Sequence, residues 1–211
     1  MGLLSFPRCT GLLTGPCPRP LTPARPVPFV QQRHKALVPL ERERELVVAC
    51  APLRSNINLS RIVRTAGCLG IRKVIACGAA RVIEKIARNS VDDGDGPSRK
   101  ESDSAGGDDG PSGVEIEVHR TLPPVLKELR AAGYQLVALE QTTDSTSIFD
   151  FRFERKTALI IGNERSGLDE DELRLVHRVV EIPMYGLPHA LNAATATAMA
   201  LYEYCRQYPS G

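Results

Sequence analysis

The sequence predicts an α/β fold, in which a mostly parallel sheet carries helices on both of its faces. Short β-branched or apolar runs alternate with longer stretches of helical periodicity over residues 46–207. Strand, helix and strand at this spacing require crossover connections, which place the strands parallel and pack the helices against the sheet. The chain of 211 residues is long enough for one such domain with a sizeable core and some additional tail.

The order of elements follows from the composition of each segment and from the residues that begin and end helices. Runs with the length and composition of strands lie at 46–51, 73–77, 114–119, 134–140, 157–162 and 179–183. Helical patterns lie between or after them, at 58–69, 122–132, 169–178 and 191–207. We expect Asn58 and Asp169 to be N-caps, and Gly70 and Gly133 to follow the C-terminal ends of the first two helices. Together these elements predict one domain over residues 41–211.

Two segments differ in composition from this domain. Residues 1–40 hold five Lys or Arg, no Asp or Glu, and eight prolines. Such a leader is either an organellar transit peptide or a disordered extension, and its prolines exclude a long amphipathic helix. Residues 89–113 hold seven acids, two bases and almost no apolar side chains, which predicts a disordered acidic insertion.

Composition also excludes some function classes. No apolar run is long enough to span a bilayer, so we expect a soluble protein without a membrane partner. The six cysteines form no C-x-x-C pair, which indicates reduced thiols and no metal site. With the leader and insertion set aside the domain is nearly neutral, so an RNA site must be a local patch. We expect a cytoplasmic protein, or a mitochondrial or other organellar one if the leader is a transit peptide.

Ligands bind an open parallel sheet at the carboxyl ends of its strands, so the loops there are the first places to search. The loop after the first strand leads into N-L-S-R-I-V-R-T-A-G, where Asn58 precedes Arg61 and Arg64 on one helix face. Two guanidinium groups suit phosphate or ribose oxygens. The alternative, which spacing alone favours, is a capped helix with a solvated basic face.

A second loop, I-G-N-E-R-S-G-L-D, leaves the strand at 157–162 and enters a helix. Gly162 and Gly167 allow a positive φ or a close backbone approach. Their spacing is that of a phosphate loop, but Leu168 and Asp169 stand where Lys and Ser or Thr are required, which excludes a nucleoside-triphosphate site. A tight strand-to-helix turn is the alternative.

A third loop, I-P-M-Y-G-L-P-H-A-L-N, brings Asn192 to the start of a helix built largely from Ala and Thr. Small residues let helices approach closely, as a buried or dimer-facing helix requires. Plain core packing is the alternative for most of this helix.

In this order the three loops resemble the signature motifs of the SpoU/TrmH branch of the SPOUT RNA methyltransferases, over residues 46–207 without the acidic insertion. The resemblance implies a C-terminal trefoil knot, a homodimer, S-adenosylmethionine as cofactor, and methyl transfer to a ribose 2′-hydroxyl of tRNA or rRNA. Donor contacts, made largely by the backbone in this family, carry over to Leu139, Gly162, Ile182 and Leu191.

The resemblance also implies catalytic roles. Arg64 would activate the hydroxyl, either as the base or, as its high pKa favours, by stabilising the developing alkoxide. Asn58 and Asn192 would orient the substrate, and Glu164 would hold Arg64 or the loop. Many relatives have serine where this chain has Ala190, which leaves a non-catalytic RNA-binding or scaffold protein as the alternative function.

Overall fold

The computed structural model describes residues 36–78 and 113–211, and Pro39–Gly211 forms the compact unit to which all elements below belong. These elements are β1 (Leu46–Cys50), α1 (Asn56–Cys68), β2 (Lys73–Cys77), β3 (Glu115–His119), α3 (Leu122–Ala131), β4 (Gln135–Leu139), β5 (Thr146–Ser147), β6 (Thr157–Ile161), α4 (Glu170–Leu175), β7 (Arg178–Glu181) and α5 (Ala193–Gln207). The strands form one sheet in the order β3-β2-β1-β6-β4-β7-β5, with every pairing parallel. The predicted α/β fold is confirmed.

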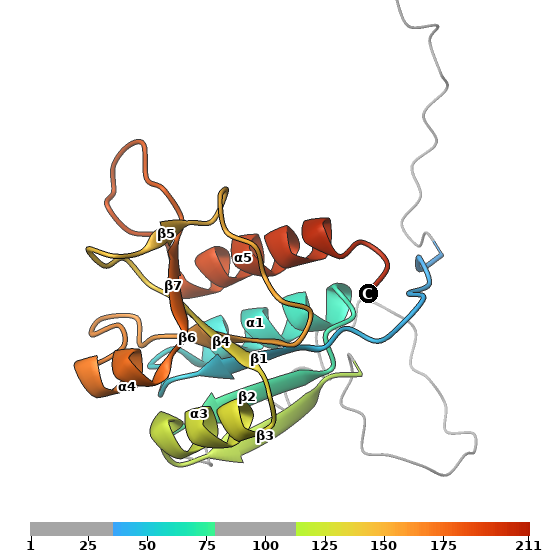
Figure 1. Ribbon diagram of the computed structural model, residues 1–211, viewed down its shortest axis with the longest axis horizontal. Coiled ribbons are helices and arrows are strands. Elements are labelled where there is room, and N and C mark those ends of the chain that lie inside the picture. The colour runs from blue at the N-terminus through green and yellow to red at the C-terminus, as the bar shows by residue number, and fades with distance from the viewer. Residues whose placement is uncertain (1–35, 79–112) are drawn as a thin grey trace, which may run out of the picture. The chain divides into compact units, whose positions relative to one another are not determined.

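Helices cover both faces of the sheet, with α1 and α5 on one side and α3 on the other (Figure 1). Alternate residues of β1 therefore enter different cores, and the whole strand is buried. Val48 packs in the core that contains Ile62 of α1 and Leu201 of α5. Val47 packs in the core that contains Leu126 of α3. This two-sided burial explains why the strands read as continuous apolar runs.

The helix starts agree with the sequence at one position and differ at another. Asp169 caps α4 as predicted: its carboxylate accepts a hydrogen bond from Glu172 N at 2.8 Å, and the Glu172 carboxylate accepts one from Asp169 N at 3.0 Å. The prediction of Asn58 as an N-cap is wrong. Helix α1 begins at Asn56, because Ser55 is the cap and its hydroxyl accepts from Asn58 N at 3.3 Å.

The structure also tests the predicted ends of the helices and adds one short strand. Gly70 and Gly133 follow α1 and α3 with φ of 71° and 82°, as a helix C-terminus favours. Helix α4 is shorter than the predicted 169–178, because Val176 is extended and leads directly into β7. Strand β5 was not predicted, since two residues are too few to show periodicity.

The chain order within the sheet determines where the loops meet. From β4 the chain runs to the edge strand β5, enters the interior as β6, and returns as β7 between β4 and β5. The carboxyl ends of β4, β6 and β7 are therefore neighbours, and the loops after them lie together. The trefoil knot itself stays a prediction. No helix in the described ranges is long and apolar enough to cross a membrane.

The predicted disorder of the leader and of the acidic insertion lies outside the described residues, apart from residues 36–40 and Gly113. The domain boundaries at 40 and 41, and the limits of the insertion, therefore stay predictions.

Candidate functional site

A pocket opens where the loops after β4, β6 and β7 meet the start of α5. It is lined by Leu139, Glu140, Gln141, Ile161, Gly162, Glu164, Glu181, Ile182, Met184, Ala190, Leu191, Ala193 and Ala196. The structure thus brings together Leu139, Gly162, Ile182 and Leu191, the residues that sequence resemblance assigned to the cofactor. Their contacts with a cofactor stay a prediction, but their convergence is a property of the fold.

The charged side chains that line this pocket are all acidic. Among the described residues, three carboxylates line it, those of Glu140, Glu164 and Glu181, and no Lys, Arg or His does. Besides Gln141, the other described residues of the lining are apolar or glycine. We call it the acidic pocket.

Glu164 joins the three motif loops through hydrogen bonds. Its carboxylate accepts from Arg54 N at 2.8 Å, from Ser55 N at 3.0 Å and from Asn58 Nδ2 at 3.0 Å. Asn192 Nδ2 in turn donates to Asn58 Oδ1 at 3.0 Å. Of the two roles that the sequence left open for Glu164, the structure shows it holding the loop and not Arg64.

The hydrogen bonds around Glu164 occupy the polar groups of Glu164, Asn58 and Asn192. Partial burial disfavours ionisation of Glu164, but hydrogen bonds from Arg54 N, the Asn58 side chain and Ser55 N outweigh it and hold its pKa below the usual 4.5. Asn58 is only 6% exposed. Asn192 also caps α5, because its Oδ1 accepts from two backbone N–H groups of the first turn. The substrate-orienting roles predicted for Asn58 and Asn192 stay predictions.

The glycines of the second loop are required by the loop itself. A Cβ on Gly162 would lie 2.7 Å from the carbonyl carbon of Gly167 and 2.9 Å from Leu168 N. Gly167 has a φ of 65°, in the left-handed region. The close backbone approach that the sequence allowed at Gly162 is made by the protein's own chain, and the contact of Gly162 with the cofactor stays a prediction.

Sequence reasoning missed the part played by Asn163 in this loop. Its Nδ2 donates to Pro52 O at 2.7 Å, and its Oδ1 accepts from Arg165 N at 2.9 Å. An Asn directly after a glycine and before a polar turn is a signal for such a side-chain-to-backbone bond. Asn163 therefore connects the second loop to the first independently of Glu164.

Arg64 lies in a different place from the acidic pocket. It is exposed on α1 and lines a second hollow, which we call the α1–α5 groove. The groove is mainly apolar and includes Arg64, Leu69, Phe149, Ile182, Met199 and Tyr202. Of these, Phe149 is 65% exposed and Tyr202 is 68% exposed. Within one chain, the described lining of the acidic pocket includes Glu164 but not Arg64, Asn58 or Asn192.

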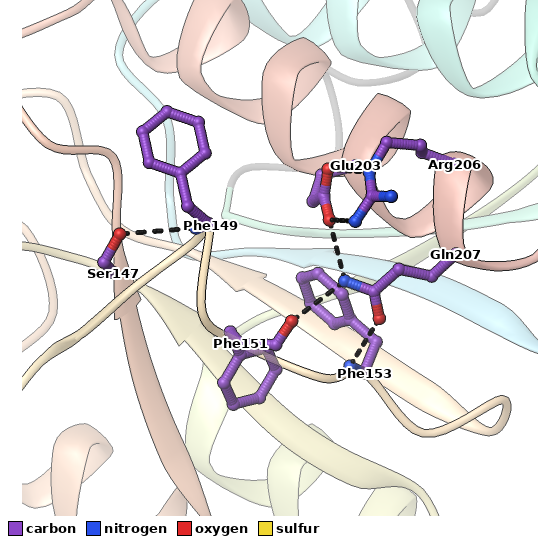
Figure 2. Close-up of polar contacts among 7 residues, drawn as sticks. All are labelled: Ser147, Phe149, Phe151, Phe153, Glu203, Arg206 and Gln207. Carbon is purple, nitrogen blue, oxygen red and sulfur yellow. Dashed lines mark hydrogen bonds and ion pairs between the residues drawn. The ribbon is translucent and has the colours of Figure 1, made fainter. Parts of the chain in front are cut away.

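One wall of the groove is fixed by a side-chain clamp, which the sequence did not reveal. Figure 2 shows the amide of Gln207 bridging the backbone of the segment after β5: its Nε2 donates to Phe151 O at 2.9 Å and its Oε1 accepts from Phe153 N at 3.0 Å. The rings of Phe151 and Phe153 are buried, whereas that of Phe149 remains exposed at the groove. No local signal indicated the clamp, because Gln207 lies 54 residues from Phe153 in the chain.

The two described ranges contain no group of three or more His, Cys, Asp or Glu side chains that could hold a metal ion.

With this geometry in place, comparison with known proteins identifies the family. The model of the SpoU rRNA Methylase family matches residues 45–202. The chain belongs to this family. Its match begins at β1 and ends within α5, so it includes both the acidic pocket and the α1–α5 groove.

Related sequences are RNA methyltransferases by name. The chain is 27% identical over 166 residues to a tRNA (guanosine(18)-2′-O)-methyltransferase of Escherichia coli, with 79% of this chain and 65% of the relative covered. A protein of the same name from Thermus thermophilus is 29% identical, with 79% and 77% covered. The chain thus matches about two thirds of the length of the Escherichia coli relative.

Solved structures give the same fold. The Aquifex aeolicus TrmH/SpoU tRNA modifying enzyme superposes with a TM-score of 0.62 at 25% identity, covering 81% of this chain and 78% of that one. The SpoU methyltransferase AviRb from Streptomyces viridochromogenes, in complex with AdoMet, gives 0.59 at 26% identity, covering 82% and 64%.

Proposed function

We propose that this protein is an S-adenosylmethionine-dependent RNA methyltransferase that transfers a methyl group to a ribose 2′-hydroxyl of tRNA or rRNA. The observation that carries the proposal is the convergence of Leu139, Gly162, Ile182 and Leu191 on one pocket, in a chain of the SpoU family. Relatives named as tRNA and rRNA 2′-O-methyltransferases support the same reaction. The nucleotide and the RNA are left open by this support.

The acidic pocket fits the proposed cofactor. S-adenosylmethionine supplies a methyl group on a positively charged sulfonium. Apolar walls from Leu139, Ile182 and Leu191 suit its adenine and ribose faces, and the carboxylates suit its positive charge. The Glu164 network holds the loops of the pocket in a fixed relation, so the site is formed before a ligand binds.

For the acceptor, we assign Arg64 to stabilise the alkoxide that forms as the ribose hydroxyl loses its proton. A guanidinium remains charged at neutral pH, so it serves better as a fixed positive charge than as a base. A phosphate oxygen or water would then take the proton. This assignment needs Arg64 near the methyl donor, whereas within one chain Arg64 lines the α1–α5 groove and not the acidic pocket.

We therefore propose a homodimer in which the α1–α5 groove receives a second copy and Arg64 of each copy serves the pocket of the other. The groove is the kind of surface that an interface buries, since Phe149, Met199 and Tyr202 expose large side chains together. Two-fold pairing is the commonest arrangement for such chains.

Methylation can be tested directly. Purified protein is incubated with S-adenosylmethionine carrying a labelled methyl group and with total RNA, and nucleosides are analysed by mass spectrometry. We expect labelled 2′-O-methylnucleosides. Label on bases alone would contradict ribose specificity, and donor binding without transfer to any RNA would favour the scaffold alternative.

Sharing of the site predicts complementation. Arg64→Ala and Ala190→Trp each remove one half of the composite site, the second by filling the acidic pocket. Mixed and re-equilibrated, the two inactive variants should recover about a quarter of wild-type activity, because each heterodimer contains one intact pocket opposite one intact Arg64. A mixture that stays inactive while heterodimers form would place Arg64 and its pocket in the same chain.

The compartment stays a prediction, either cytoplasmic or organellar, because the leader that decides it lies outside the described residues.

A further inference from the structure

The carboxylates of the acidic pocket lack cationic partners of their own. Among the described residues, none of Glu140, Glu164 and Glu181 forms an ion pair with Lys, Arg or His, and no basic side chain lines the pocket. Carboxylates elsewhere, such as Glu170 and Glu203, do pair with arginine. The acidic pocket therefore carries negative charge that no described basic side chain neutralises.

The three carboxylates are not equivalent. Glu164 accepts three hydrogen bonds from the first loop, so much of its charge is engaged. The Glu181 carboxylate accepts one from Ser145 Oγ at 2.9 Å. Glu140 accepts only long bonds, from Gln141 N and Leu168 N at 3.3 Å each. The charges of Glu140 and Glu181 are thus the more available to a ligand.

Glu140 is also the carboxylate that the glycine loop accommodates. A Cβ on Gly167 would lie 2.6 Å from Glu140 Oε2, and one on Gly162 would lie 3.0 Å from the same atom. Because Gly162 and Gly167 have no Cβ, the Glu140 carboxylate fits between the loop and the wall of the pocket. The carboxylate therefore lies against the backbone of the glycine loop.

We propose that Glu140 and Glu181 make the acidic pocket selective for charge, so that it binds the sulfonium S-adenosylmethionine more tightly than the neutral thioether S-adenosylhomocysteine. The inference rests on the proposed function, and it assigns a specificity-determining role to two residues of the pocket. Donor and product differ by one methyl group and one positive charge, and they share the adenosine and amino-acid parts. A difference in affinity between them therefore reports on how the pocket treats that charge.

The physical reason is the low dielectric of a pocket with apolar walls. An unpaired carboxylate a few ångströms from a cation attracts it far more strongly there than in bulk water. The neutral thioether sulfur of the product gains nothing from this attraction, so transfer of the methyl group weakens retention of the product. Selectivity for charge would then limit inhibition by the product.

The test uses calorimetry with both ligands on the full chain, its Glu140→Gln variant and its Glu181→Gln variant. We expect the unaltered protein to prefer S-adenosylmethionine. Each substitution should weaken S-adenosylmethionine binding by roughly tenfold and change S-adenosylhomocysteine binding by less than about twofold. Glu128→Gln, an exposed change on α3, is the control and should alter neither affinity.

The outcomes are distinguishable. Equal losses for both ligands in Glu140→Gln would overturn the inference, because they would show that Glu140 acts on a part that the two ligands share, or on the loop, and not on the sulfonium. A second measurement needs no variant: raising the salt concentration should weaken S-adenosylmethionine binding more than S-adenosylhomocysteine binding, and equal weakening would count against the inference. If the unaltered protein binds neither ligand, the proposed function itself fails.

Discussion

The acidic pocket and the α1–α5 groove lie close in the fold but have opposite character. The pocket is built at the carboxyl ends of strands, is lined by three carboxylates, and is fixed by the Glu164 network. The groove is built from helix surfaces, is mainly apolar, and carries Arg64. Ile182 contributes to both linings, so the two hollows adjoin at this residue.

This difference shows that one motif can serve two regions. Asn58 and Arg64 belong to the same motif and the same helix, yet Asn58 is bound into the pocket network and Arg64 faces the groove. A helix advances about 9 Å over six residues, which is enough to separate them. A composite site made by two chains accounts for both placements, and the predictions below test this division of roles.

The largest effect is expected for Arg64→Ala. Loss of a fixed positive charge beside the reacting oxygen should lower turnover by about a hundredfold or more, while S-adenosylmethionine affinity changes by less than about twofold. Single-turnover rates at saturating RNA and calorimetry measure the two quantities. Arg64→Lys should restore little, because an ammonium cannot reproduce the planar guanidinium.

Arg174→Ala, on the exposed side of α4, is the matched control and should leave turnover unchanged. A normal single-turnover rate for Arg64→Ala, combined with weaker RNA binding and a smaller salt dependence, would move Arg64 to a phosphate-binding role.

A smaller effect, on stability, is expected for Glu164→Ala. The substitution leaves two backbone N–H groups and the Asn58 amide without their acceptor, which should lower the free energy of unfolding by about 2 kcal/mol. Urea unfolding measures it. Glu128→Ala, exposed on α3, should change the same quantity by less than about 0.5 kcal/mol.

The lowered pKa of Glu164 adds a pH signature to this prediction. Its contribution to stability is present above the usual pKa of 4.5 and is lost as the pH falls through the lowered value. Glu164→Gln should therefore reduce the loss of stability in acid. An unchanged acid profile would indicate that other carboxylates dominate it.

The smallest effect is expected for the paired change Met199→Ser with Tyr202→Ser in the groove. Both side chains are exposed in the single chain, so the folded subunit should keep its donor affinity. The dissociation constant of the dimer should rise by about tenfold, because the interface loses apolar area. Light scattering at several concentrations measures it, with Val118→Ser on β3 as the exposed apolar control. A dimer of unchanged stability would locate the interface elsewhere.

Much of the fold could be predicted because its determinants are local. Apolar runs such as 46–51 and 157–162 became β1 and β6, since strands buried on both faces need continuous apolar side chains. The Asp169 capping signal also held, because a cap involves residues only three apart. Asn58 failed as a cap because Ser55, three residues earlier, caps the helix, and only the structure shows that the Asn58 side chain is bound by Glu164, which lies 106 residues away.

The sequence by itself determined the order of elements, the parallel sheet and the identity of the three motif loops, because periodicity and loop composition are written within short windows of the chain. Only the tertiary structure decided that Glu140 and Glu181 join the pocket, that Gly162 is required by its own loop, and that Arg64 faces a separate groove. These are properties of strand order and helix packing. They depend on which distant segments become neighbours, and no local pattern specifies that.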